Sequence, residues 1–155
     1  MATRSTIALE YADGTVDKIY CHWDGYLDNN GKILFQHYVD PFKTQRLMDL
    51  GDISSLGPDI GDKHEFDIPF KYGTPEYQAE ADRRRNICTF YGRDRGETGT
   101  GAKRYKDYAD YRKNAQFEEY NYILRKDGNW YVEFYGKFDG LLKEAIEQET
   151  AEEMA

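Results

Sequence analysis

Two stretches of this chain have the pattern of a β-hairpin, and they constrain the fold more than any other feature. Within residues 4–22, two alternating segments flank a turn at Asp13-Gly14. Within residues 116–135, two further segments flank a turn at Asp127-Gly128. Asp-Gly favours short hairpin loops because glycine readily adopts a positive φ. The chain should therefore contain at least two antiparallel strand pairs.

Helical patterns lie between and after these hairpins. From Lys32 onward the apolar side chains recur with helical spacing. Asp40-Pro41 is typical of a helix start, and Gly51 is typical of a helix end. Pro75 would begin a helical turn over residues 75–82. The expected strands are residues 4–11, 16–22, 86–91, 116–125 and 129–135, and the expected helices are residues 32–39, 41–50 and 141–155.

These elements predict an α+β fold with a single twisted, mainly antiparallel sheet of about five strands and helices packed on one face. We expect one domain over residues 1–140, followed by an acidic C-terminal helix at 141–155. That helix should fray at its end, because Glu152 and Glu153 lie near the negative end of the helix dipole.

Charge is distributed unevenly along the chain. The 155 residues carry a net charge of -8, yet residues 83–113 hold ten basic and four acidic side chains, a local charge of +6 that leaves -14 elsewhere. Such a segment either pairs with the protein's own acids or forms an anion-binding patch. An aromatic content of 15% argues for a folded core rather than disorder.

The start of the sequence, MATRST, lacks the apolar core of a signal peptide. No apolar run approaches the roughly 18 residues that a membrane helix needs. Cys21 and Cys88 are the two cysteines, a number that favours reduced thiols over a disulfide framework. We therefore expect a cytoplasmic protein without a membrane partner.

The densest group of chemically useful side chains is His22-Trp23-Asp24-Gly25-Tyr26. It follows a predicted strand and precedes a predicted helix, a position where side chains often line a cleft. Trp23 and Tyr26 could stack a base, and Asp24 could accept hydrogen bonds from its edge. In the alternative interpretation, Trp23 and Tyr26 fill the core, Asp24 caps the loop and Gly25 takes a positive φ.

A second group begins at the end of the strand predicted over residues 86–91. Tyr91-Gly92-Arg93-Asp94-Arg95-Gly96-Glu97 brackets two arginines with glycines, an arrangement suited to holding an anion. With Arg104, these arginines would bind phosphates. The alternative is a solvated loop in which Asp94 neutralises an arginine.

Catalytic and metal-binding patterns are missing from the sequence. His22, His37 and His64 have no partner at a recognised ligand spacing, and neither a phosphate-binding loop nor a dinucleotide fingerprint is present. No serine or cysteine lies in a nucleophile motif. We expect a non-catalytic binding protein without a metal or another cofactor. An enzyme acting on a nucleotide would have only His22 with Asp24 as a local acid–base pair.

Three motifs together resemble a family of small, mostly uncharacterised phage and prophage accessory proteins. They are HWDGY at residues 22–26, LGDISSLG at 50–57 and YGRDRGE at 91–97. The resemblance covers about residues 4–97 and implies a counter-defence role, but it brings no catalytic residues with it.

Two functions follow as expectations. In the first, the protein sequesters a small anionic nucleotide-type ligand without turnover, in a site that a homo-oligomer closes. Trp23 and Tyr26 would stack the base, Asp24 would read a base or ribose edge, and Arg93, Arg95 and Arg104 would hold the phosphates. His22 and Tyr91 are the other expected ligand-binding residues. In the second, the acidic surface imitates nucleic acid and inhibits a host protein target that binds nucleic acid or acts in defence.

Overall fold

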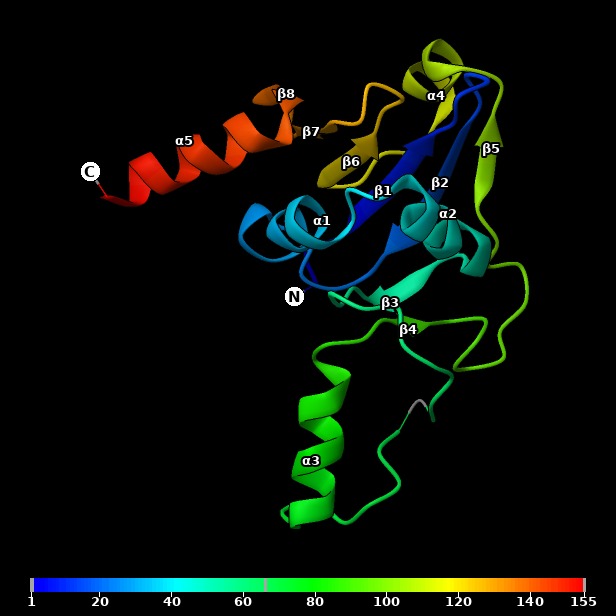
Figure 1. The fold of residues 1–155 in the computed structure, drawn as a ribbon, viewed down its shortest axis with the longest axis vertical. Helices are drawn as coiled ribbons and strands as arrows, with labels where there is room; N and C mark the ends of the chain where they lie inside the picture. Colours follow the sequence, from blue (N-terminus) through cyan, green and yellow to red (C-terminus); the bar gives the residue numbers. More distant parts are fainter. Residues whose placement is uncertain (1, 66, 155) are drawn as a thin grey trace.

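The computed structural model describes residues 2–65 and 67–154 and has an α+β fold (Figure 1). Its strands are β1 (Ser5–Glu10), β2 (Val16–Cys21), β3 (Ile53–Ser55), β4 (Thr89–Phe90), β5 (Lys103–Tyr105), β6 (Tyr120–Leu124), β7 (Trp130–Phe134) and β8 (Phe138–Leu141). Its helices are α1 (Lys32–His37), α2 (Pro41–Leu50), α3 (Pro75–Arg84), α4 (Tyr108–Asn114) and α5 (Leu142–Met154), and a π-helical segment, η1 (Leu27–Gly31), precedes α1.

The sheet is larger and more mixed than expected. Its order is β4-β3-β2-β1-β6-β7-β8, with β5 also paired to β2. Both predicted hairpins, β1–β2 and β6–β7, are antiparallel and therefore confirmed. The prediction of about five mainly antiparallel strands is partly wrong, because β1 pairs with β6, and β2 with β3, in parallel. Local patterns reveal hairpins, whereas these parallel pairs join segments far apart in the sequence.

One edge of β2 is divided between two other strands. The antiparallel partner β1 occupies the whole of the opposite edge, from Ser5↔Cys21 to Glu10↔Val16. Along the divided edge, β5 pairs with Val16–Lys18 and β3 meets β2 only at Cys21. Tyr20 lies between these two pairings, so the outer edge of the sheet is split at this residue.

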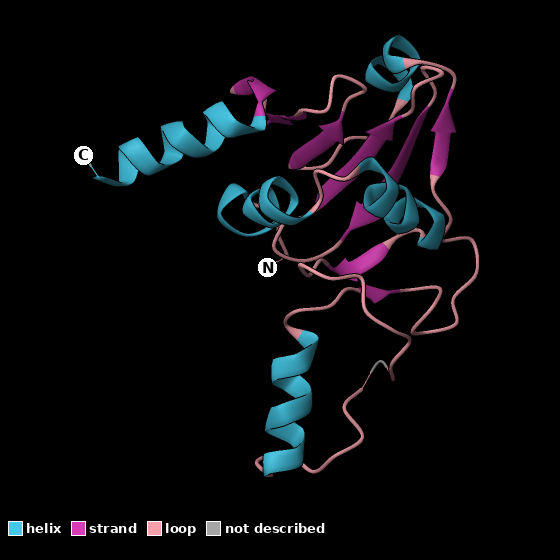
Figure 2. Ribbon diagram, viewed as in Figure 1, coloured by secondary structure: helices cyan, strands magenta, loops and turns pink. Residues whose placement is uncertain are grey.

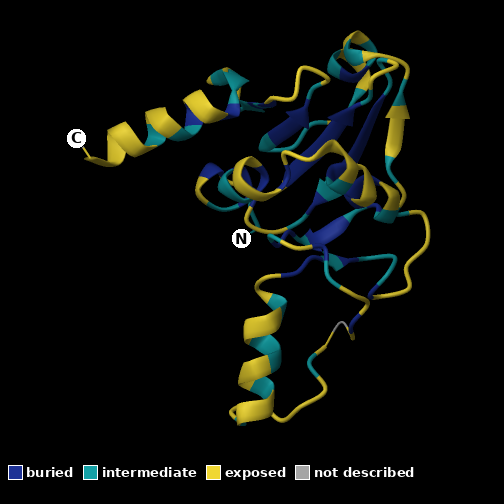
Figure 3. Ribbon diagram, in the orientation of Figure 1, coloured by how far each residue is buried: buried dark blue, intermediate teal, exposed yellow. Residues whose placement is uncertain are grey.

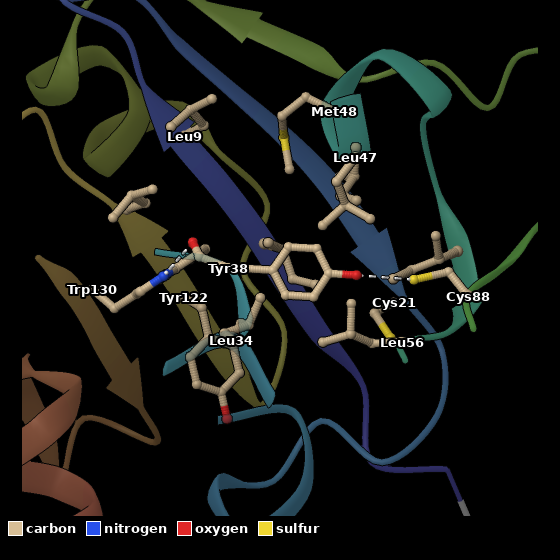
Figure 4. Packing of buried hydrophobic residues seen from close by; sticks show 14 of the residues in the cluster. Leu9, Cys21, Leu34, Tyr38, Leu47, Met48, Leu56, Cys88, Tyr122 and Trp130 are labelled. Carbon is tan, nitrogen blue, oxygen red and sulfur yellow. Dashed lines mark hydrogen bonds between the residues drawn. The ribbon is translucent and has the colours of Figure 1, made fainter. Parts of the chain in front are cut away.

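Side chains on one face of the sheet build the main core. Ile7 and Leu9 of β1 and Ile19 and Cys21 of β2 join buried residues of α1, α2 and the first turn of α5. Figure 4 shows Tyr38 at the centre of this cluster. Its hydroxyl donates a hydrogen bond to the Gly57 carbonyl at 2.7 Å, and the Trp130 indole donates to the Tyr38 carbonyl at 3.0 Å. These bonds tie the loop after α1 to both ends of the sheet.

The opposite face carries a smaller cluster. Ala8, Val16 and Ile123 pack there against Tyr111 of α4. The expectation that helices pack on one face is therefore wrong for α4, which packs on the opposite face. With cover on both faces, all six residues of β1 are buried (Figure 3).

Two helices project from this body. No residue of α3 is buried, and α5 buries only Leu142 and Ala145 (Figures 1 and 2). The capping predicted for α2 is confirmed, because the Asp40 side chain accepts a hydrogen bond from the Phe42 amide and Gly51 has a φ of 86°. Of the expected strand over residues 86–91, only Thr89–Phe90 forms β4.

We predict that Tyr38→Phe destabilises the protein by about 1–3 kcal/mol, because it leaves the buried Gly57 carbonyl without its main donor. Urea unfolding followed by circular dichroism measures the loss. Tyr72→Phe is the matched control, since Tyr72 is exposed and should give an unchanged midpoint. Equal midpoints for wild type and Tyr38→Phe would contradict the prediction.

Candidate functional site

His22 and Trp23 extend the line of β2 past its last residue. Their backbone amides donate to the carbonyls of Ile53 and Ser54, at 3.2 and 3.0 Å. The His22 Nδ1 lies 2.7 Å from the Tyr20 hydroxyl, and the His22 and Trp23 rings meet edge to face with centroids 4.8 Å apart. Trp23 is 45% exposed. The interpretation of Trp23 as a core residue is therefore wrong.

The turn that follows has a different geometry from the one expected. Asp24, and not Gly25, has the positive φ, at 57°. Gly25 is required by close packing instead, because a Cβ there would lie 2.6 Å from the Ser5 Cβ. Tyr26 is exposed rather than part of the core. Asp24 and Tyr26, like the neighbouring Trp23 in the sequence, are thus exposed at the surface.

Tyr91 follows β4 and is held near the end of β2. Its amide donates to the Asp52 carbonyl at 3.2 Å. Burial raises the pKa of Tyr91, and a hydrogen bond with Ser54 opposes that effect. Burial also raises the pKa of Tyr20; the charge of Arg4 opposes this effect, and electrostatic interactions with Glu118 and Tyr91 add to it. Tyr91 therefore belongs to the same part of the sheet as Tyr20 and His22.

The Arg93 side chain forms its hydrogen bonds within the protein. Its guanidinium donates to the carbonyls of Ile60, Gly61 and Cys88 at 3.2, 2.7 and 3.1 Å. It also forms two hydrogen bonds with Asp94, at 3.0 and 3.1 Å. Every nitrogen of the guanidinium is thus engaged within the chain. Arg93 holds the loop around Gly61 to the end of β4 and is not positioned to bind phosphate.

The other two arginines of the expected phosphate site lie elsewhere. Arg95 is 52% exposed and pairs with Glu97 at 3.4 Å. Arg104, on β5, makes two hydrogen bonds with Asp17 at 2.9 and 3.0 Å. Asp17 lies toward the start of β2, at the opposite end from His22. The structure joins His22, Trp23 and Tyr91 to the same segment, residues 52–54, but it does not assemble the eight predicted residues into one site.

A polar cleft lies at the split in the sheet, on the face that carries α4. Its volume is about 190 Å³. Three elements of the sheet and two loops supply the lining, which consists of Thr6, Lys18, Tyr20, Asp52, Lys103, Gln116 and Glu118. We call these residues the split-sheet cleft.

Position along the strands explains why this cleft is polar. On β1 and β2, Ala8 and Val16 lie under α4 and are apolar, whereas Thr6 and Lys18 lie on the same face outside the cluster that α4 covers. The Tyr20 amide has no strand carbonyl opposite it and instead donates to the Asp52 Oδ1 at 2.9 Å. The Asp52 carboxylate thus takes the place of a missing strand at the floor of the cleft.

Lys18 is the most constrained charged group in the cleft. It is only 7% exposed, and its Nζ donates to the Gln116 carbonyl at 2.9 Å. Burial lowers the pKa of this amine, and so does the positive charge of Lys103, its cross-strand partner; Asp52 and Glu118 oppose the shift. Removing a charge from water disfavours the charged form.

Asp52 is shifted in the opposite sense. Burial raises the pKa of its carboxyl, although the Tyr20 amide and the charges of Lys18 and Lys103 favour the ionised form. The cleft therefore contains an amine that is a weaker base than usual and a carboxyl that is a weaker acid. Such opposed shifts in one cleft are characteristic of functional sites.

No sequence motif marks this site. Lys18 lies in an alternating strand, and Lys103 follows a glycine-rich stretch of the sequence. The one available signal was parity, that is, the alternation of side chains between the two faces of a strand, which places Lys18 on the same face as Val16 and Tyr20. Parity alone does not show which face the helices leave open.

Other chemistries have less support. Burial raises the pKa of Cys21 to about 12, so this thiol is protonated at neutral pH and a poor nucleophile. Within residues 2–65 and 67–154, no group of three or more His, Cys, Asp or Glu side chains could hold a metal ion. No helix in the same residues is long and apolar enough to cross a membrane.

Comparisons with protein-family models, with curated protein sequences and with solved structures gave no match. The resemblance to phage accessory proteins stays a prediction. The cleft is therefore interpreted from its own chemistry.

We predict that Arg93→Ala destabilises the fold by about 3 kcal/mol, because it removes the partner of the buried Asp94 carboxylate. Arg95→Ala, at an exposed position of the same loop, is the matched control and should change stability by less than about 0.5 kcal/mol. Urea unfolding of both variants measures the difference. A folded, equally stable Arg93→Ala protein would contradict the internal role of Arg93.

The effect of Arg93→Ala should also depend on pH. Burial would raise the pKa of Asp94, but hydrogen bonds from Arg93 and from the Phe90 and His64 amides lower it below the ordinary 3.8. A carboxyl with a depressed pKa stabilises the fold at pH values above 3.8, and that stabilisation is lost as the pH falls through the lower, folded-state pKa. The stability gap between wild type and variant should therefore narrow in acid.

Proposed function

We propose that the protein binds a small anionic ligand with an aromatic ring, of the nucleotide type, in the split-sheet cleft. The observation that carries this proposal is the side-by-side placement of Lys18 and Lys103 at the cleft wall. On the resemblance to phage accessory proteins, the proposed role is to remove such a ligand from solution without turnover.

Two ammonium groups on facing strand positions repel one another, and like charges directly opposite destabilise a sheet. Among the described residues, the ion pairs with N–O distances up to 4.0 Å include neither of these lysines. A phosphate group bound between the amines would offset their repulsion and accept their hydrogen bonds. Asp52 and Glu118 also line the cleft and favour the charged form of Lys18, but neither forms an ion pair with the lysines within 4.0 Å, so the two amines can still bind an anion.

Aromatic side chains continue from the lysines along β2. Lys18, Tyr20 and His22 are every second residue, so their side chains point to the same face. From Lys18 to His22 this row spans about 13 Å at the usual strand rise. That length matches a ligand with a phosphate at one end and a ring at the other. The exposed Trp23, in edge contact with His22, and Tyr91 would supply stacking surfaces. Asp52 and Glu118 would accept hydrogen bonds from a base or a sugar.

A second candidate function is binding to a protein partner. The observation in its favour is the pair of projecting helices, since α3 buries no residue and α5 is acidic along its exposed length. On α5, burial and the like charges of Glu153 and Asp28 raise the pKa of Glu149. Such crowding of acids would be relieved by a basic partner. Substitutions in the cleft would leave this function unchanged.

We predict that adenosine 5′-diphosphate binds the wild-type protein and that Lys103→Gln weakens binding at least about tenfold, or about 1.4 kcal/mol. Lys113→Gln on α4 removes the same charge from an exposed position outside the cleft and should leave affinity unchanged. Isothermal titration calorimetry in low salt measures both. Equal affinities for the two variants would place the anion elsewhere.

We predict that Trp23→Ala weakens adenosine 5′-diphosphate by about 1–3 kcal/mol, the usual contribution of one stacked base, while inorganic pyrophosphate binds as before. The comparison separates the ring end of the site from its anionic end. Tyr135→Ala, an exposed aromatic outside the cleft lining, is the control. A parallel loss of both ligands would contradict the assigned role of Trp23.

A further inference from the structure

Lys18 has a second property that anion binding does not use. Its amine lies inside a cleft, close to a second ammonium group and to a carboxyl. We propose that Lys18 is a reactive amine that forms a reversible imine with a small aldehyde or ketone carrying an anionic group. The proposal deepens the function above and rests on the same cleft, because the anionic group would be held by Lys103.

The position of Lys18 favours one defined attack geometry. The side chain is 7% exposed, which restricts its rotamers, and the hydrogen bond to the Gln116 carbonyl fixes where Nζ lies. It nevertheless lines the cleft, so a compact ligand in the cleft contacts it. Holding a nucleophile and its substrate in one orientation raises the effective concentration of the reacting groups.

Protonation decides whether the amine can react, because only the neutral amine has a lone pair. Burial and the charge of Lys103 both lower the pKa of Lys18, and the opposing effects of Asp52 and Glu118 are smaller. Desolvation and a neighbouring cation are the two ways in which imine-forming lysines are activated. More of Lys18 is therefore neutral at physiological pH than of an exposed lysine.

The reaction balances without another reagent. The Nζ lone pair attacks the carbonyl carbon, the C=O π electrons move to oxygen, and a proton passes from nitrogen to that oxygen. The resulting carbinolamine then takes a second proton on its hydroxyl group, the C–O bond breaks and water leaves. The nitrogen lone pair forms the C=N bond, and the remaining N–H proton is released. Amine and carbonyl thus give imine and water.

Asp52 is placed to carry the proton that the departing hydroxyl needs. It lines the same cleft, interacts electrostatically with Lys18, and has a carboxyl whose pKa burial raises. A carboxyl that holds its proton to higher pH is a better donor near neutrality. Tyr20 also lines the cleft, and its hydroxyl lies 2.7 Å from the His22 Nδ1.

The test uses pyridoxal 5′-phosphate, an aldehyde with a phosphate, at one equivalent of the intact protein, followed by reduction with sodium borohydride and peptide mass spectrometry. We expect Lys18 to be modified at least about fivefold faster than Lys113. The modification rate at Lys18 should also reach its maximum at a lower pH than the rate at Lys113. Lys18→Met should lose the fast phase, and Lys113→Gln should keep it. Circular dichroism of each variant verifies folding.

Uniform modification of the lysines, or a fast phase at Lys103 instead of Lys18, would overturn the proposal. Inorganic pyrophosphate separates this failure from failure of the proposed function, because it carries no carbonyl. If pyrophosphate binds the cleft but Lys18, measured without pyrophosphate, is modified no faster than Lys113, the reactive amine is ruled out and the anion site remains. If Lys18 is modified fast but pyrophosphate neither binds the cleft nor slows that modification, the anion site is ruled out and the reactive amine remains. The proposal expects pyrophosphate to slow modification of Lys18.

Discussion

A hydrogen bond from the Tyr20 amide to the Asp52 carboxylate bridges the gap between the two strands that pair with the outer edge of β2. β2 needs a partner along its outer edge, and two short strands share that task, β5 at one end and β3 at the other. Between them the backbone of β2 has no strand carbonyl to bond, and a buried amide without an acceptor would be unfavourable. The Asp52 side chain supplies that acceptor, at the point where the sheet opens.

The opening decides what the neighbouring side chains can do. Because α4 covers only the apolar part of this face, Lys18 and Tyr20 line a cleft while Val16 joins the smaller core. Burial then shifts the Lys18 amine and the Asp52 carboxyl toward their neutral forms, the direction expected of charges removed from water. Anion binding by the two lysines and nucleophilic reactivity of Lys18 both follow from that one arrangement.

The sequence predicted the local structure well and the assembly poorly. Both Asp-Gly hairpins and the Asp40-Pro41 helix start were predictable, because turn and cap chemistry depends on neighbouring residues. The parallel pairing of β1 with β6 joins distant segments, and β5 is too short to show an alternating pattern. The same limit applies to the site. His22, Trp23 and Tyr91 were identified and lie near the cleft. Arg93 is internal because two of its carbonyl acceptors, Ile60 and Gly61, come from a loop 33 and 32 residues earlier.

The most direct test of the account is the titration of the Lys18 side-chain amine by nuclear magnetic resonance in isotopically labelled protein, with and without inorganic pyrophosphate. We expect a pKa below the ordinary value of 10.5 in the free protein, because the charged amine is buried beside Lys103. We expect pyrophosphate to raise this pKa, because a bound anion favours the charged form. An amine that titrates at the ordinary value and does not respond to pyrophosphate would contradict the cleft as an anion site.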